Sequence, residues 1–207
     1  MFSSFCLKQP SLSLLPLVLC LALCACGRSQ PTQYYAFASQ PENLVRNSLP
    51  KTTLRIARVA LPQYLEREPL VLRKKGHVDL QVDSLHVWAE PLTDGVRRLL
   101  ASELRQPLLA QGITLLPTAT EKIGTYTLLV DISRLDGSFG DMAEIEAHWS
   151  LLTGEQDRII RDGFFAKALP VPQGSYQDLV ETEGNLVRDL ARHMLAAMPR
   201  HPQKSAD

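Results

Sequence analysis

Cysteine is missing from most of this chain of 207 residues. The four cysteines all lie in the first 26 positions, and they are Cys6, Cys20, Cys24 and Cys26. A domain formed by the rest of the chain therefore holds no disulfide, although exported proteins often rely on them. Cleavage just before the last cysteine would leave one thiol in the whole protein.

An excess of charge is missing as well. The chain carries 22 Lys and Arg residues against 22 Asp and Glu residues, a formal net charge of +0. A neutral chain gives no support for a nucleic-acid partner, which normally requires a basic face. After residue 23, no apolar run approaches the roughly 20 residues of a transmembrane helix. No internal repeat of the solenoid type is found.

Motifs of known catalytic and metal chemistry are also missing. The chain has no G-x-S-x-G, no P-loop, no G-x-G-x-x-G and no H-E-x-x-H. Its five histidines are scattered without metal-ligand spacing, at His77, His86, His148, His193 and His201. Asp131, Asp136 and Asp141 do not match an EF-hand, and Glu144 with Glu146 is more typical of a wet sheet face than of an acid/base pair. The sequence predicts no catalytic residue, no metal and no cofactor.

What the chain does have begins with an apolar run from Leu12 to Leu23. The run is too short to span a bilayer but has the length of a signal-peptide core. It ends in LCACG (residues 23–27), which resembles the lipobox of bacterial lipoproteins: an aliphatic residue three before the modified cysteine and a small residue just before it. We predict a signal peptide over residues 1–25 and acylation of Cys26. A plain signal peptide and a buried apolar helix are the alternatives.

Gly27 bears on the destination. In Gram-negative lipoproteins an aspartate at this position is the usual inner-membrane retention signal, so the resemblance implies the periplasmic face of the outer membrane. Each buried methylene contributes about 0.8 kcal/mol, so two or more acyl chains such as palmitate make a durable anchor. Residues 26–51 are rich in Ser, Pro, Gln and Asn and are predicted to form a tether. Tyr34, Tyr35 and Phe37 interrupt it and should dock, either on their own domain or on a partner.

The globular domain is expected over residues 52–198, with a disordered polar tail over residues 199–207. Residues 53–61 and 69–73 are predicted strands, and residues 78–88 hold one or two more. A change of face in the first strand indicates burial on both sides or a bulge near Ala57. Residues 92–106 have helical spacing of apolar side chains, and Pro107 is expected to end that helix.

The second half predicts three strands and a helix. Residues 126–133 and 143–151 alternate apolar and polar, and residues 159–169 do so less regularly. A final helix is expected over residues 176–198, where Ser175 and Asp178 resemble a capping box. The fold class is α/β of the α+β type, with two main helices on a mixed, largely antiparallel sheet.

Two blocks carry a family resemblance: LPQYLEREPLVLR (residues 61–73) and VWAEPL (residues 87–92). Together they resemble the ABC-type transport auxiliary lipoproteins typified by PqiC, a membrane-integrity transporter subunit. That family shows a strand ending in proline, then Tyr-Leu and an arginine, then an apolar-Val-x-Arg strand, and later Trp-Ala-Glu-Pro-Leu at the start of a long helix. Paired aromatics after the lipidated cysteine also match. Glu66 departs from the more usual aspartate, and His86-Val87 replaces the commoner arginine.

The resemblance implies a domain similar to the N-terminal domain of TolB, working beside an MCE-type protein that moves lipids between membranes. The residues that match the family are Tyr34, Tyr35, Pro62, Tyr64, Arg67, Arg73, Trp88, Glu90 and Pro91. They serve either to brace the fold or to contact the partner, and self-association is left open. The alternative function is a structural or regulatory lipoprotein that scaffolds another machine of the cell envelope.

Overall fold

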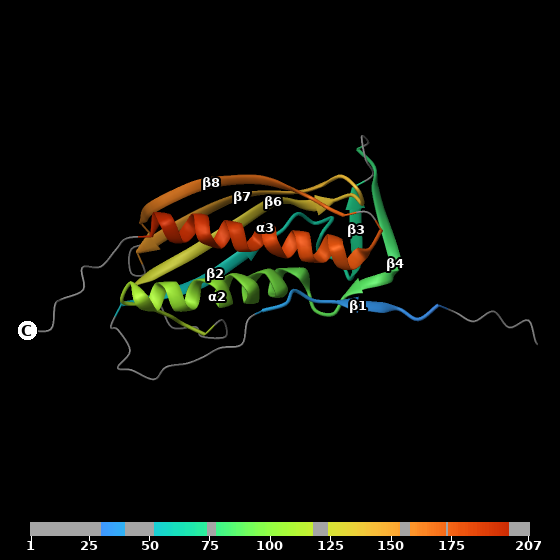
Figure 1. Ribbon diagram of the computed structural model, residues 1–207. Helices are drawn as coiled ribbons and strands as arrows, with labels where there is room; N and C mark the ends of the chain where they lie inside the picture. Colours follow the sequence, from blue (N-terminus) through green and yellow to red (C-terminus); the bar gives the residue numbers. More distant parts are fainter. Residues whose placement is uncertain are drawn as a thin grey trace, which may run out of the picture. The chain divides into compact units, whose positions relative to one another are not determined.

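The structure is a computed structural model that describes residues 30–39, 52–73, 78–117, 124–153, 158–172 and 174–198 (Figure 1). Cys26 and the rest of the predicted signal peptide and lipobox lie outside the described residues. So does the predicted tail over residues 199–207.

The main sheet has the order β5-β2-β6-β7-β8. Its strands are β2 (Thr52–Ala60), β5 (Ile113–Leu115), β6 (Tyr126–Gly137), β7 (Met142–Thr153) and β8 (Ile159–Pro170). β2 runs parallel to β5 and β6, whereas β6, β7 and β8 form an antiparallel meander. The predicted mixed, largely antiparallel sheet is confirmed.

Three further strands extend one end of β6. They are β3 (Pro69–Arg73), β4 (Leu80–Trp88) and β1 (Gln33–Tyr35). β3 continues along the same edge of β6 as β2 and pairs with it where Leu72 meets Gly137. β4 is antiparallel to β3 and parallel to β1. Figure 1 shows β3 and β4 standing upright across this end of the sheet, with β1 beside the end of β4.

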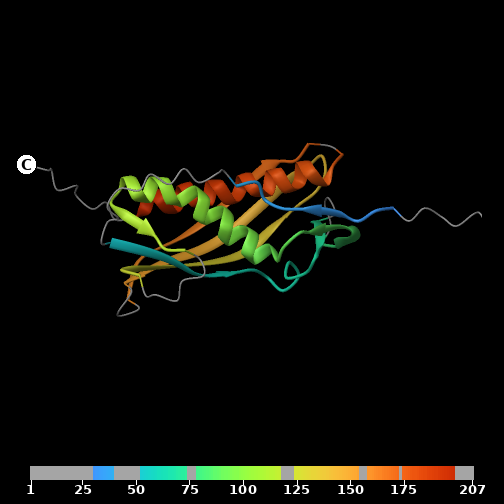
Figure 2. The same cartoon turned by 90° about the horizontal axis from the view of Figure 1, so that it is seen from below.

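Two helices, α2 (Leu92–Ala110) and α3 (Tyr176–Ala197), cover one face of the main sheet (Figures 1 and 2). α3 begins as the sequence suggests, because the Ser175 hydroxyl oxygen accepts from the Asp178 backbone N–H at 3.1 Å. The hydroxyl in turn donates to the Asp178 carboxylate at 2.7 Å, in place of the backbone bond of a full capping box. Neither helix in the described part of the chain is long and apolar enough to cross a bilayer.

The core lies between the sheet and these helices. Alternate residues of β6 and β7 are buried there, among them Leu128, Val130, Ile132, Ala147, Trp149 and Leu151. The pairing of β2 with β6 shifts register between Ile56 and Arg58, which places the predicted bulge at Ala57. Of the two alternatives that the sequence left, the bulge explains how Val59 is buried with Leu54 and Ile56.

The predicted end of the first helix is wrong. α2 continues through Pro107 to Ala110. A proline this close to a C-terminus removes only one of the last backbone bonds, so the final turn still closes, with the Gln111 N–H donating to the carbonyl oxygens of Leu108 at 2.9 Å and Pro107 at 3.2 Å. Gly112, at φ 76°, then takes the left-handed conformation that ends many helices.

The folded domain also begins before Thr52, where the sequence placed its start. β1 lies inside the expected tether, and residues from Thr32 onward belong to the same compact unit as the main sheet. Strands as short as β1 and β5 give no detectable alternation, which is why both were missed.

Gly163 gives a test of the packing under β8. It lies directly opposite Trp149 in the β7–β8 pairing, and a Cβ at Gly163 would come within 2.8 Å of the indole ring. We expect Gly163→Val to lower the free energy of unfolding by about 1–3 kcal/mol, the usual cost of overpacking. Urea denaturation followed by circular dichroism measures it. Ala166→Val, at an exposed position of the same strand, should change it by less than about 0.5 kcal/mol; equal losses would contradict the packing account.

Candidate functional site

Asp136, near the end of β6, is the centre of a buried polar cluster. Its carboxylate accepts from the Tyr64 hydroxyl at 2.7 Å, from Arg73 Nε and Nη2 at 2.7 Å each, and from Arg134 Nε at 3.2 Å. Asp136 is 0% exposed. Arg134 also pairs with Glu144 on the neighbouring strand. We call Asp136, Tyr64, Arg73 and Arg134 the brace.

Electrostatics keep the brace charged. Burial alone would raise the pKa of Asp136, but the hydrogen bonds from Arg73 and Tyr64, with the Arg73 charge and the Arg134 contact, outweigh it and hold that pKa below its usual value. Burial and the bond to the same carboxylate raise the pKa of Tyr64. The two family-matching residues Tyr64 and Arg73 therefore fasten the loop after β2, and β3 with it, onto β6.

Pro62 opens this loop. Its carbonyl accepts from the Leu65 backbone N–H at 2.9 Å, which forms a turn. The turn presents the Tyr64 hydroxyl to Asp136 and buries Leu65 in the core. Pro62 thus has a structural role beside the brace.

Glu183 on α3 is a second buried acid, and it lies close enough to Asp136 for the two side chains to interact electrostatically. Burial, and then the charge of Asp136, raise the pKa of Glu183 well above its ordinary value. This shift favours the neutral, protonated form of Glu183 in the folded protein.

The N-terminal segment docks on its own domain through Tyr35 and Phe37. This is one of the two alternatives that the sequence left open, the other being a partner. The Tyr35 hydroxyl hydrogen-bonds His86 Nδ1 at 2.8 Å, and the Tyr35 carbonyl accepts from the Ala89 N–H at 2.7 Å. Phe37 is buried with its ring 5.0 Å from that of Trp88. A Cβ added to Gly95 of α2 or Gly184 of α3 would come within 3.5 or 3.3 Å of the Phe37 ring. Tyr35 and Phe37 form what we call the N-terminal clasp.

Glu90 belongs to the same clasp. It pairs with Arg98 of α2, which also donates to the Phe37 carbonyl and to Ser39 Oγ, both at 3.2 Å. The Glu90 carboxylate thus orients the guanidinium that holds the clasp on the helix. Trp88 is almost fully buried against Phe37. Glu90 and Trp88 therefore stabilise the position of the N-terminal clasp on the domain.

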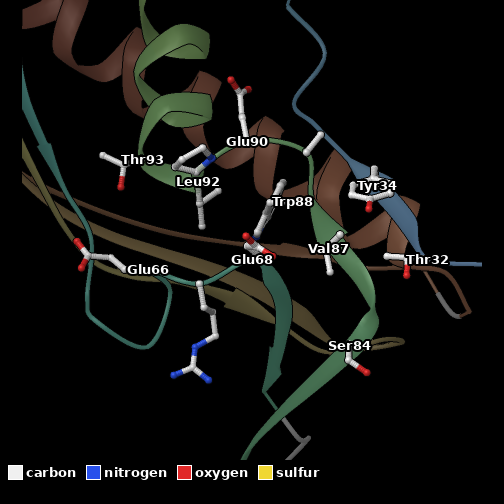
Figure 3. A pocket seen from close by; sticks show the side chains of 13 residues that line it. Thr32, Tyr34, Glu66, Glu68, Ser84, Val87, Trp88, Glu90, Leu92 and Thr93 are labelled. Carbon is white, nitrogen blue, oxygen red and sulfur yellow. The ribbon is translucent and has the colours of Figure 1, made fainter.

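A groove of about 780 Å³ lies where β1, β4, the loop after β2 and the start of α2 meet. Figure 3 shows Glu66 and Glu68 on one side, Thr32 and Tyr34 on the other, and Val87 and Trp88 between them. The remaining lining residues are Arg67, Ser84, Ala89, Glu90, Pro91, Leu92 and Thr93.

Three family-matching residues in the groove are exposed to solvent. Tyr34 is 71% exposed, the reverse of its neighbour Tyr35. Arg67 is exposed and has no hydrogen-bond or ion-pair partner among the described residues. Pro91, also exposed, precedes the first residue of α2. The groove therefore offers one unpaired guanidinium and one aromatic ring beside carboxylates.

The family-matching residues thus divide between bracing and the groove, and Trp88 and Glu90 contribute to both. Sequence reasoning missed Asp136 as the partner of Tyr64 and Arg73. The one signal in the sequence was the position of Asp136 itself, an acidic residue near the end of β6, one residue before Gly137. In the part of the chain that the structure describes, no three His, Cys, Asp or Glu side chains gather as a metal site would require. His148, expected on a wet face, is exposed, with its ring 4.8 Å from that of Phe164.

Fold and site together define a two-helix α+β domain with a braced loop and a groove at one end. Residues 35–195 match the model of the ABC-type transport auxiliary lipoprotein component. The chain belongs to this family, as its sequence blocks predicted.

Solved structures share the fold. One, of an uncharacterized protein, has a TM-score of 0.67 at 19% identity and covers 82% of this chain and 100% of its own. Protein XCC0632 from Xanthomonas campestris has a TM-score of 0.60 at 19% identity, covering 79% of this chain and 92% of its own. No functionally curated protein matches the chain in sequence.

The buried acid of α3 predicts a pH dependence. Because folding raises the pKa of Glu183, the folded state binds its proton more tightly, and the resulting stability is lost as pH rises above the ordinary glutamate pKa. Glu183→Gln keeps a neutral side chain at every pH. The difference in free energy of unfolding, variant minus wild type, should therefore increase as the pH is raised from about 5 to about 8. The increase is at most about 1.4 kcal/mol per pH unit.

Urea denaturation at several pH values measures this gain. Glu181→Gln, at an exposed position of the same helix, is the control and should leave the pH profile unchanged. A constant difference between Glu183→Gln and the wild type across this range would contradict a raised pKa.

Proposed function

We propose that this protein is a non-catalytic outer-membrane lipoprotein component of an intermembrane lipid transport system of the MCE type, which supports envelope integrity. The observation that carries the proposal is the exposed Arg67 in a groove lined by family-matching residues, in a chain that belongs to a transport auxiliary family. An auxiliary subunit must contact its transporter, and this groove has the unpaired polar groups that such a contact uses.

The use of the charged side chains supports a non-catalytic role. Asp136, Glu90 and Glu144 are each committed to an arginine within the domain. A general acid or base needs a carboxylate that is free to exchange a proton with a substrate, and these three are tied up in ion pairs.

The membrane attachment rests on Cys26 with Gly27 after it, which favours the periplasmic face of the outer membrane. Replacing Cys26 with Ala removes the thiol that would be acylated, so we expect the variant to leave the membrane fraction. Fractionation of cell envelopes followed by immunoblotting measures this. A Cys6→Ala variant, changed in the segment that is cleaved away, is the control and should stay with the outer membrane. Persistent attachment of Cys26→Ala would overturn the anchor.

The partner contact is tested at Arg67. Arg67→Glu reverses the one basic side chain of the groove that has no partner among the described residues, and it leaves the brace and the clasp unchanged. We expect it to reduce capture of the MCE-type protein at least tenfold, as loss of a docked charge often does. Arg161→Glu makes the same charge change at an exposed position on β8 and should capture the partner normally.

Affinity purification from solubilised envelopes, with quantitative mass spectrometry, gives the readout. Both variants should keep the melting temperature of the wild type. If the wild type captures another envelope machine and no MCE-type protein, the transport proposal fails and a structural or regulatory scaffold takes its place.

A further inference from the structure

Exposed large apolar side chains gather at the groove end of the domain. Among the described residues seven such side chains are exposed, and four of them are Tyr34 at 71%, Val78 at 89%, Leu80 at 37% and Val82 at 44%. All four belong to β1, to β4 or to the residues just before β4. We call these four the apolar ridge.

The ridge continues one wall of the groove. Leu80 and Val82 are two residues apart in the part of β4 that pairs regularly with β3, so their side chains point to the same face of the strand. Ser84 lines the groove together with Tyr34. Figure 3 shows both residues on the β1–β4 side of the groove. Groove and ridge therefore form one surface, polar at the groove and apolar along β4.

Chain length ties this end of the domain to the lipid anchor. Gln33, the first residue of β1, is the seventh residue after Cys26. Even fully extended, seven residues reach only about 25 Å. The sequence had predicted a tether of 26 residues, but β1 pairs with β4 well before that length is used. The β1–β4 end must therefore stay near the bilayer, while the C-terminal end of α3 lies at the other end of the domain (Figures 1 and 2).

We propose that the apolar ridge rests in the interface of the lipid leaflet to which Cys26 is attached. This inference deepens the proposed function and rests on its anchor, but not on its transport partner. Tyrosine is typical of the boundary between lipid and water, and burying the valine and leucine side chains is favourable there. A domain held within about 25 Å meets this leaflet at very high effective concentration, which suits a weak contact of a few side chains.

The chemistry of the ridge predicts which lipid headgroups are sufficient for the contact. Among the described residues of the groove and of the segment just before β4, Glu66, Glu68 and Asp79 are exposed acids and Arg67 is an exposed base. The proposed contact is made by the apolar side chains of the ridge and needs no anionic headgroup. The contact is therefore apolar, and it forms on zwitterionic phosphatidylcholine vesicles and does not weaken at high salt.

The cysteine distribution makes a clean experiment. The mature chain has one cysteine, which acylation occupies, so any cysteine added to the domain is the only free thiol. Val82→Cys and Tyr34→Cys place a bimane dye on the ridge. Ile159→Cys places it on an apolar side chain that is 57% exposed and lies at the start of β8, outside the ridge. The full acylated chain is reconstituted into phosphatidylcholine vesicles and recovered by flotation.

The ridge dyes should shift to shorter wavelength in vesicles and lose intensity when the phosphatidylcholine carries bromine on its acyl chains. The dye at position 159 should do neither. Flotation without quenching at positions 34 and 82 overturns the ridge contact and leaves the anchor standing. A protein that does not float overturns both.

A competing occupant gives a different result. If a second copy of this chain or another protein covers the ridge, the dyes at positions 34 and 82 shift in detergent on raising the protein concentration or adding the partner, and bromine has no effect. This outcome would also overturn the proposal. The vesicles contain no transport partner, so a failed capture in the Arg67→Glu experiment does not change the expectation here.

Discussion

The buried carboxylate of Asp136 is the constraint on which the rest of this structure depends. A charge without exposure to water is tolerated only where hydrogen bonds and opposite charges surround it, and here two arginines and a tyrosine do so. Because Tyr64 lies in the loop after β2 and Arg73 ends β3, their shared partner fixes the loop and β3 on the end of β6. The β3–β4 pair is thereby positioned across that end, and one wall of the groove with it.

The N-terminal clasp completes the groove from the other side. Phe37 fits between the two helices where Gly95 and Gly184 leave room, and Glu90 holds Arg98 against the backbone of the same segment. These contacts keep β1 on β4, so Tyr34 stays at the groove while Tyr35 faces inward. The same packing contacts thus have two effects: they shape the groove, and they shorten the chain segment between the domain and the proposed lipid anchor at Cys26.

Much of the fold could be predicted from the sequence, because its long elements have strong periodicity. The alternation in β7 and the helical spacing in α3 gave elements that the structure places within one or two residues of their predicted bounds. β1 and β5 were not predicted because a three-residue strand is too short to show an alternation of apolar and polar residues. The end of α2 was predicted too early because Pro107 was treated as a proline in the middle of a helix. Within the site, the family blocks pointed to Tyr64, Arg73, Trp88 and Glu90, but their partners could not be found from spacing.

The sequence by itself determined the family, the two-helix architecture and the absence of cysteine from the folded domain. It also predicted that Tyr34, Tyr35 and Phe37 dock, which holds for Tyr35 and Phe37 but not for the exposed Tyr34. Only the tertiary structure decided which of these side chains are buried and which are exposed. Tyr35 hydrogen-bonds His86, whereas its neighbour Tyr34 faces solvent. Arg73 binds Asp136, whereas Arg67 has no partner among the described residues. The reason is physical. Whether a side chain is buried depends on residues 50 to 150 positions away that fold against it, such as His86 for Tyr35 and Ala38 for Arg188, and no local pattern contains them.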